Sequence, residues 1–483
     1  MLRRVLFQGL TAAVLAAGAV IGAAGPAGAH ATILGTEPRY GASLATPPER
    51  VLIRYDLPVE LPGAQISMTR SGKAVSVGRP EFGSPDRKSV ALPLSKLSPG
   101  PYVLTWFLFG SDGDVMGGEL TFTILSGSGA AAAPTVGPVL DQRAPTQFAG
   151  LSFAPLSRAQ DLARLGASAS LIVFVGSLAF AAALWWAGAL VPRFRLIVWA
   201  SLLLALLSNA GALGLKGAAV QGRSALAALS PSSLSALSGT HVGKVLAVRL
   251  GLLVLAIPVV ALMTMAPERV LGADLWYIGA AASTLGALAT HAWLSHAWTE
   301  GMLAAAVHLV HLAAISVWLG GLVILAVVVL PRRQIEELRD LVPRFSRLAF
   351  RSVVTAVVAG TALLVLISPR WSALPTSEYG RFLIAKLLLV VGLLAAASRA
   401  RAFVQRHFLA DSGTASPSDL PADEPAIAVS GTAPVATLVA THAGPAWGGP
   451  TLRPFVNAVA AELCIAASIL AATAFLVGRA PPS

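Results

Sequence analysis

No charged residue interrupts the segment Leu165–Val191, LGASASLIVFVGSLAFAAALWWAGALV. An apolar run of about 20 residues is long enough to cross the roughly 30 Å hydrocarbon core of a bilayer as a helix. This run is the first of eight, and together they predict an all-α polytopic membrane bundle of about eight transmembrane helices. The other seven runs cover residues 196–215, 245–266, 274–291, 303–330, 351–368, 381–398 and 455–478.

The composition of the whole chain agrees with a membrane protein. Of its 483 residues, 55% are hydrophobic and only 12% are charged, whereas a soluble domain carries about 25% charged residues. The formal net charge is +12, but the basic residues gather in short loops between apolar runs. This pattern is an orientation signal, so we expect the lipid bilayer as the surroundings and no nucleic acid as a partner.

The basic loops also indicate which way the chain crosses the membrane. If the N-terminus is exported, the loops after the first, third, fifth and seventh runs lie inside the cell. Cytoplasmic loops are enriched in Lys and Arg, so we expect a multi-pass protein of the inner (plasma) membrane. The inner loops hold Arg193, Arg195, Arg269, Arg332, Arg333, Arg339, Arg344, Arg347, Arg399, Arg401, Arg406 and Arg453, against Lys216, Arg223 and Arg370 outside.

Residues 1–29 have the pattern of a secretory signal peptide. Arg3 and Arg4 precede a short apolar stretch that ends in Ala27-Gly28-Ala29, and such an A-x-A end is typical of a cleavage site. An uncleaved anchor helix is the alternative. Cleavage after Ala29 would make His30 the first mature residue, whose α-amine, imidazole ring and amide could all supply nitrogen to a metal ion.

Residues 30–125 predict an extracytoplasmic β-domain. Several short β-prone runs are separated by turn-forming clusters such as Pro99-Gly100, and this spacing is typical of a β-sandwich. Residues 126–160, rich in Gly, Ala and Pro towards their start, predict a linker, and residues 161–483 form the membrane domain. The clearest runs are Val51–Tyr55, Gln65–Met68, Tyr102–Phe109 and Leu120–Ile124.

The β-domain resembles the CopC copper-binding domain. The resemblance rests on His30-Ala31, Glu37-Pro38 with Gly41-Ala42, Pro47-Pro48, and Gly100-Pro101-Tyr102 leading to Ser111-Asp112-Gly113. It implies an all-β Ig-like sandwich that binds Cu(II) through the mature N-terminal His together with an Asp and a His from an Asp-Gly-His segment. This chain reads Asp112-Gly113-Asp114, so a carboxylate replaces the family's second histidine.

The replacement weakens the expected copper site of the β-domain. Cu(II) favours nitrogen-rich tetragonal sites, and a carboxylate is a harder ligand than imidazole. His30, Asp112 and Asp114 are therefore candidate ligands of a looser copper site. The alternative is a solvated turn, for which Asp-Gly-Asp is equally well suited.

The histidines are concentrated in one part of the membrane domain. Five of eight lie between His241 and His311, and the predicted topology puts His291, His308 and His311 in the outer part of adjacent spans. The i,i+3 spacing places His308 and His311 on one helix face, about 60° apart. Ionisable residues at membrane depth are costly and indicate function, and imidazole suits copper. Hydrogen bonding between helices is the alternative role.

The membrane domain resembles the CopD copper-resistance family. The segment from His311 to Leu322, HLAAISVWLGGL, looks like the family's signature. The resemblance implies a CopC–CopD fusion and a role in copper homeostasis. His308 stands where many relatives have an acidic residue. The histidine would add a nitrogen ligand. Supporting segments are His291-Ala292, Arg344–Leu348, and Glu378–Arg381 running to Lys386.

The expected function is a copper homeostasis membrane protein that binds copper outside and moves it across the inner membrane, in the direction of import. The candidate membrane ligands are His291, His308 and His311; an extracytoplasmic copper donor protein is a candidate partner. We expect no enzymatic activity, because the chain has no Walker motif and no Asp-Lys-Thr-Gly phosphorylation run. Two alternatives remain: a b-type haem protein with paired axial histidines, and a copper-binding or sensing protein without transport.

Overall fold

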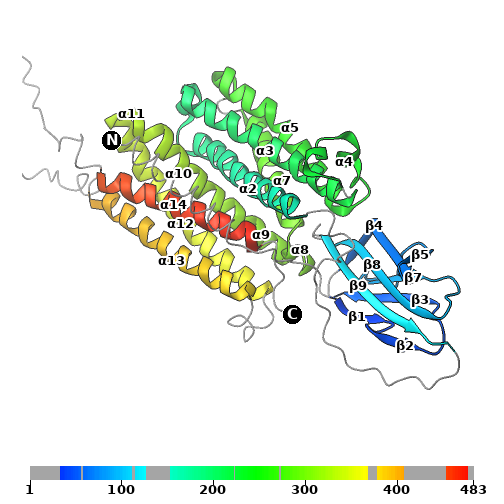
Figure 1. Ribbon diagram of the computed structural model, residues 1–483. Helices are drawn as coiled ribbons and strands as arrows, with labels where there is room; N and C mark the ends of the chain where they lie inside the picture. Colours follow the sequence, from blue (N-terminus) through cyan, green and yellow to red (C-terminus); the bar gives the residue numbers. More distant parts are fainter. Residues whose placement is uncertain are drawn as a thin grey trace, which may run out of the picture.

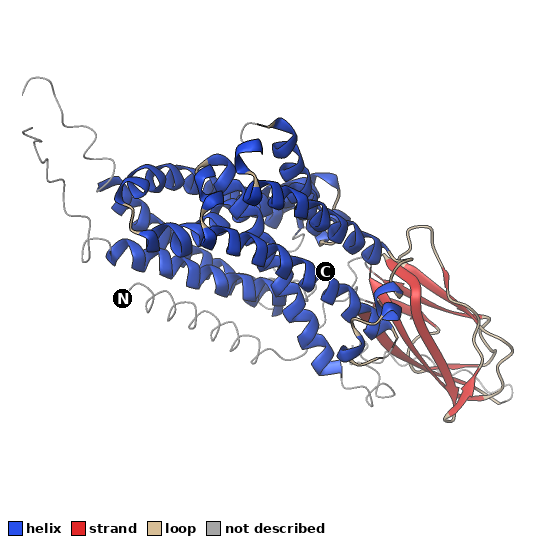
Figure 2. Cartoon of the chain, turned by 90° about the horizontal axis from the view of Figure 1, so that it is seen from above, coloured by secondary structure: helices blue, strands red, loops and turns tan. Residues whose placement is uncertain are grey.

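The chain consists of a β-sheet head at one end of a long helical bundle (Figures 1 and 2). A computed structural model describes residues 33–55, 58–110, 115–126, 153–221, 223–270, 273–367, 378–406 and 453–476. The predicted fold class, an all-β domain followed by an all-α membrane bundle, is confirmed.

The head is a sandwich of two sheets. One sheet has the strand order β1-β3-β7-β6 and the other the order β2-β9-β8-β4-β5. The four β-prone runs identified in the sequence all lie within strands, in β3, β4, β8 and β9. The strands are β1 (Ile33–Glu37), β2 (Ala42–Leu44), β3 (Arg50–Tyr55), β4 (Val59–Arg70), β5 (Lys73–Val75), β6 (Glu81–Phe82), β7 (Ser89–Pro93), β8 (Gly100–Gly110) and β9 (Val115–Ile124).

The core of the head follows from the two-residue period of a strand. Alternate side chains of β8, at Tyr102, Leu104, Trp106 and Leu108, are all almost fully buried between the sheets. The ring of Tyr102 stacks on Phe122 of β9 with centroids 5.3 Å apart. Its hydroxyl donates a hydrogen bond to the carbonyl of the loop residue Ser98 over 2.7 Å, so the one polar atom of this ring is satisfied.

The bundle contains the eight long helices that the apolar runs predict. Within the described residues, six helical segments are long and apolar enough to cross a membrane: Arg158–Ala183, Pro192–Val220, His241–Met265, Met302–Arg332, Glu336–Ile367 and Ile384–Val404. The remaining two are α7 and α14, and the number eight is therefore approximate for membrane crossings. The long helices are α2 (Phe153–Ala183), α3 (Pro192–Val220), α5 (His241–Met265), α7 (Asp274–Trp293), α9 to α11 (within Met302–Arg332), α12 (Ile335–Ile367), α13 (Glu378–Val404) and α14 (Arg453–Leu476).

The first membrane helix ends earlier than its apolar run predicts. Helix α2 stops at Ala183, and Trp186–Leu190 form a short 3-10 turn instead of a continuation. A residue that precedes proline is disfavoured in the α conformation, and Val191, before Pro192, is extended with φ −83° and ψ 122°. The chain therefore reverses here, and α3 begins at Pro192. At its other end α2 starts at Phe153, within the stretch expected to be linker.

The signature segment of the membrane domain is fixed by glycine contacts. Ser316–Gly320 form a π-helical turn, η4, and such turns inside α-helices are frequently found at functional sites. A Cβ atom on Gly320 would lie 2.5 Å from the Ile172 carbonyl oxygen and 2.7 Å from the Cα of Gly176, both in α2. A Cβ on Gly321 would lie 2.6 Å from the Phe345 ring of α12. The two glycines therefore let two neighbouring helices pack directly on this turn.

The head is attached to one end of the bundle through Glu60 and Gln65 of β4. The Glu60 carboxylate accepts the backbone N–H of His241 over 2.9 and 3.1 Å, and Gln65 donates to the carbonyl of Val220. His241 is the first residue of α5, where an N–H has no partner within the helix. Phe109 of β8 adds an apolar contact, since it packs in one cluster with Leu213, Val220, Leu237, Val242 and Leu246.

Replacing Glu60 should loosen the head from the bundle. In Glu60→Ala the first amide of α5 loses its acceptor, and an unsatisfied buried donor costs about 1–3 kcal/mol. We expect faster hydrogen exchange in the first turn of α5, with the sandwich still folded. The control is Glu81→Ala, which removes an exposed carboxylate from β6. Equal exchange in both variants and the wild type would show that Glu60 does not hold the head.

The attachment should also depend on pH. Burial raises the pKa of Glu60 above its ordinary value, and this effect outweighs the hydrogen bond from His241 and the charges of Arg87 and Lys244, which act in the opposite direction. The docked head therefore binds a proton more tightly than a free head. Docking should be strongest below the ordinary glutamate pKa and should weaken as the pH rises through the raised value. The distance between spin labels in head and bundle, measured against pH, tests this, and Glu60→Gln should remove the dependence.

Candidate metal centre in the outer part of the bundle

Three of the predicted ligands lie near the end of the bundle that carries the head. His291 is close to the C-terminal end of α7, and His308 and His311 are in α9 (Met302–Ile315). Figure 1 shows α8 (His296–Thr299) and α9 near the head, while α11 (Leu330–Arg332) lies at the opposite end. The basic residues Arg332 and Arg333 are at that opposite end, as the orientation rule requires for the inner side.

His311 is held in one tautomer by helix α12. Its Nδ1 lies 2.8 Å from the carbonyl oxygen of Ala356. A carbonyl can only accept a hydrogen bond, so Nδ1 carries the ring proton and Nε2 keeps its lone pair. The ring lies against Gly360, where an added Cβ would come within 2.9 Å of Cε1. This is the arrangement that orients a metal-binding histidine, with one nitrogen fixed by a backbone carbonyl.

His308 is held by a different neighbour. Its Nδ1 lies 2.8 Å from the hydroxyl of Ser295, and that hydroxyl also lies 2.7 Å from the carbonyl oxygen of Ala292. When the hydroxyl donates its single proton to Ala292, Nδ1 of His308 donates to Ser295 and Nε2 keeps the lone pair, as in His311. His308 thus contacts the connection between α7 and α8, whereas His311 contacts α12.

His291 completes the series but has a different environment. Its Nε2 is buried and has no hydrogen-bond partner. Arg249 of α5 lies within electrostatic range of the ring; it is itself buried and donates to Thr290 over 2.7 Å and to Asn209 over 3.0 Å. An unpaired buried nitrogen is free for a ligand, but the neighbouring guanidinium charge opposes a bound cation.

The three histidines form a series of neighbours and not one closed coordination shell. Electrostatic interactions link His291 with His308, and His308 with His311. Among the residues that the structure describes, however, no three His, Cys, Asp or Glu side chains are grouped tightly enough to hold a metal ion. The structure thus places the three histidines near one another but does not test the prediction that they bind metal.

Lys386 of α13 joins this group, although the histidine pattern did not indicate it. Its charge acts on both His308 and His311. A lysine inside an apolar run is itself a signal of function, so Lys386 could have been found in the sequence, but not its neighbours. Two cations, Arg249 and Lys386, therefore flank the histidines from opposite ends of the series.

The other histidines have less to do with this group. The ring of His241 meets Trp293 edge-on at 6.2 Å, and Trp293 lies 5.3 Å from Trp298. These two tryptophans are partly exposed, as expected at a membrane interface. Only the backbone of His296 is described, at the start of α8.

The predicted ligands of the head, His30, Asp112 and Asp114, lie outside the described residues. The strands that flank them are described. Strand β1 starts at Ile33, which pairs with Tyr55, and β9 starts at Val115, which pairs with Phe109. Tyr55, Phe109 and Val115 belong to the end of the sandwich at which Glu60 contacts the bundle. Both chain segments that carry candidate ligands are therefore connected to the membrane-facing end of the head.

The architecture is that of a polytopic membrane protein in which a β-sandwich head is docked on a helical bundle that contains histidines. Comparison with known families then identifies the parts. The CopC domain family matches residues 33–125, the family "Copper resistance protein D-like, N-terminal domain" matches residues 156–305, and the family "Copper resistance protein D" matches residues 339–476. The chain is thus a CopC–CopD fusion, and its families make it a copper resistance or homeostasis membrane protein.

Solved CopC and PcoC structures match about a fifth of the chain. CopC from Methylosinus trichosporium OB3b is 27% identical, over 20% of this chain and 93% of that one, with a TM-score of 0.19. PcoC, a methionine-rich copper resistance protein from Escherichia coli, is 22% identical over 20% of this chain and all of that one, also with a TM-score of 0.19. A search of curated proteins finds no match.

The family matches leave a gap that contains part of the candidate centre. Residues 306–338, with His308 and His311, lie between the two CopD-related matches. His291 falls in the first match and Lys386 in the second. The assignment of His308 and His311 therefore depends on the local geometry described above.

Crowding the ring of His311 should weaken metal binding without removing a ligand. In Gly360→Ala the new methyl group would come within 2.9 Å of Cε1 and 3.2 Å of Nδ1, so the ring must leave the Ala356 carbonyl. Loss of such an orienting hydrogen bond typically costs about 10–100-fold in metal affinity. Titration of purified protein with copper against a competing chelator measures it.

The matched control is Gly392→Ala in α13, where an added Cβ meets nothing within 4 Å. This variant should bind copper like the wild type. Equal affinity in Gly360→Ala and Gly392→Ala would show that His311 is not a ligand in this orientation.

Proposed function

We propose that this protein captures copper outside the cell and carries it inward through the bundle. The observation that supports this most strongly is the matched state of His308 and His311. Both rings have Nδ1 engaged in a hydrogen bond, with the Ser295 hydroxyl and with the Ala356 carbonyl, so Nε2 is the ring nitrogen that each can offer to a metal ion. Nitrogen lone pairs of neutral imidazole are suitable ligands for copper.

The geometry of the head fits a transfer of copper from the head to the bundle. The strand ends that lead to His30 and to Asp112 and Asp114 belong to the end of the sandwich that contacts α5. Copper bound there would leave the head at the outer end of the bundle, near α9. On this proposal residues 1–29 are removed as a signal, and the head is extracytoplasmic, loaded by a copper donor protein.

Import is the direction that electrostatics favours. The electrical potential inside a cell is negative and attracts cations. Moving one elementary positive charge inward across the membrane releases about 2.3 kcal/mol of free energy per 100 mV. Copper entering as a cation therefore needs no ATP, which agrees with a chain that contains no nucleotide-binding motif. We propose accordingly that the protein is a transporter and not an enzyme.

The flanking cations favour the passage of a copper ion over its retention. Lys386 acts on His308 and His311, and Arg249 acts on His291. Positive charges this close oppose the retention of a metal cation in a medium of low dielectric constant. Together with the absence of a closed three-ligand site among the described residues, they favour several weak stations over one tight site.

Removing two histidines should abolish transport. We expect His308→Ala/His311→Ala to lose copper accumulation in cells and most of the copper that co-purifies with the protein, because two neighbouring ligands are gone. His241→Ala is the control, since its ring lies outside the series and only its backbone contacts Glu60. Unchanged accumulation in the double variant would end the transport proposal, and a Soret band in the purified wild type would favour haem binding instead.

Removing the positive charge of Lys386 should make the protein retain copper more strongly. In Lys386→Met we expect copper to be held about ten-fold more tightly, because a unit charge at short range in a membrane interior is worth more than 1 kcal/mol. Transport should become slower, since release becomes limiting. Lys244→Met in α5 is the control. Copper dissociation from purified protein measures the effect, and faster dissociation in Lys386→Met would contradict this role.

A further inference from the structure

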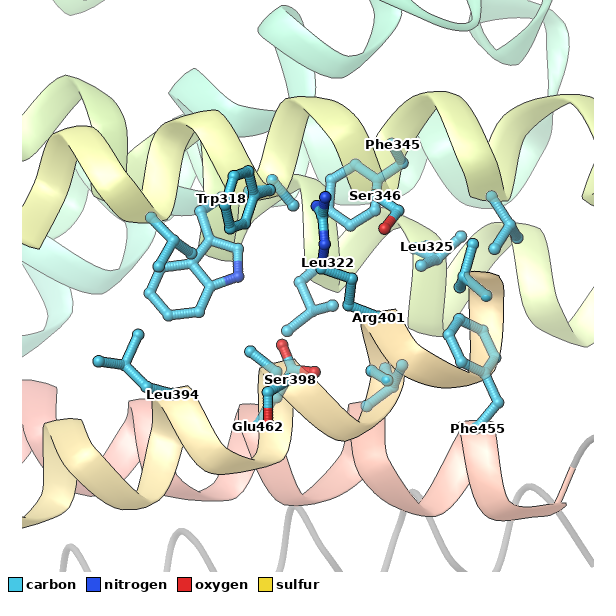
Figure 3. Close-up of a pocket in the computed structure, with 18 residues that line it drawn as sticks. Trp318, Leu322, Leu325, Phe345, Ser346, Leu394, Ser398, Arg401, Phe455 and Glu462 are labelled. Atoms are coloured by element: carbon cyan, nitrogen blue, oxygen red, sulfur yellow. The ribbon is translucent and has the colours of Figure 1, made fainter. Parts of the chain in front are cut away.

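A second group of polar side chains lies deeper in the bundle, around a cavity of about 180 Å³. The signature segment, α12, α13 and α14 all contribute to its lining. Figure 3 shows Trp318, Arg401 and Glu462 projecting into it from three different helices. Most other lining side chains are apolar, including Phe345 and Phe455.

The carboxyl group of Glu462 is the exceptional feature of this cavity. The residue is only 3% exposed, and its side chain lines the same cavity as that of Trp318, with which it interacts. Among the described residues no ion pair involves it. Arg401, the cation in the same cavity, lies instead over the ring of Phe350 at 3.9 Å. An unpaired acidic group at membrane depth is expensive and indicates a role in ion or proton movement.

Glu462 lies on the inner side of the histidines. Trp318 follows His311 by seven residues in the same continuous helix, Met302–Arg332, which is about 10 Å further into the membrane at 1.5 Å per residue. The cavity continues from there towards the inner end, because Phe455 is near the start of α14 and Arg401 near the end of α13. The histidines and the cavity thus occupy successive depths along one helix.

The lining of the cavity supplies several oxygen atoms around Glu462. Ser346 and Ser398 contribute hydroxyl groups beside the carboxyl group. Carboxylate and hydroxyl oxygens bind metal cations. A carboxyl group that gives up its proton when the cation arrives also adds the negative charge that the neutral histidines lack.

We propose that Glu462 and its cavity form the inner station of the cation route, which receives the copper ion after His308 and His311 and releases it towards the cytoplasm. This inference rests on the transport function proposed above and adds its inner binding site. Arg401 in the same cavity limits how tightly the station holds a cation, as release requires.

The test compares Glu462→Gln with Ser468→Ala, a control in the same helix whose hydroxyl donates to the Cys464 carbonyl. Proteoliposomes with a negative interior report uptake, and metal analysis of purified protein reports bound copper. We expect Glu462→Gln to keep the copper bound by the histidines, to lose the copper bound at the inner station, and to transport copper at least ten-fold more slowly, with partial recovery in Glu462→Asp. Wild-type uptake in Glu462→Gln would overturn the inner station. Failure of wild-type protein to take up copper would instead overturn the transport function.

A second measurement does not depend on the folding of the Glu462 variants. In a Cys464→Ser background, Ser346→Cys places a thiol in the cavity lining. We expect a membrane-impermeant thiol reagent to modify it from the cytoplasmic side, and bound copper to slow the reaction. Modification from the outer side only, or no modification from either side, would contradict a cavity that opens inward.

Discussion

The bilayer interior offers no water to polar groups, and this constraint organises the whole molecule. Backbone groups are satisfied within long helices, so the few polar side chains inside the bundle stand out against an apolar background. Those of Asn209, Arg249 and Thr290 bond to one another across α3, α5 and α7. His308 and His311 instead each have one hydrogen bond that orients the ring and leaves Nε2 for a ligand, and the carboxyl group of Glu462 lines a cavity. The first set of side chains therefore links helices by hydrogen bonds, whereas the second set can bind a metal ion.

The polar groups are ordered by depth and by charge. Imidazoles lie near the end that carries the head, with Lys386 and Arg249 beside them, and a carboxyl group lies further along the bundle beside a cavity. On the proposed route, a cation would pass from neutral imidazoles close to positive charges to a carboxyl group that can release its proton. This order of ligands, together with the membrane potential, is the basis of the proposal that copper moves inward.

Two kinds of close packing keep this order in place. Gly176 and Gly320 allow α2 to meet the signature segment backbone to backbone, and Gly321 admits the Phe345 ring of α12. These contacts fix the π-helical turn that carries Trp318, the partner of Glu462. At the outer end, Glu60 caps α5 and holds the head over the bundle. The position of each station thus depends on contacts between segments far apart in the chain.

The sequence by itself determined the two-part architecture, because hydropathy and strand alternation are local signals. It also identified the strands at Val51–Tyr55 and Tyr102–Phe109, and the pair His308 and His311, since i,i+3 spacing defines a helix face. It did not determine where the first membrane helix ends, nor that Lys386 lies beside the histidines or Glu462 beside Trp318. Those pairs join residues 75 or more positions apart in the chain, so only tertiary packing could bring them together. The same packing decided that the end of the sandwich with Glu60 contacts the bundle.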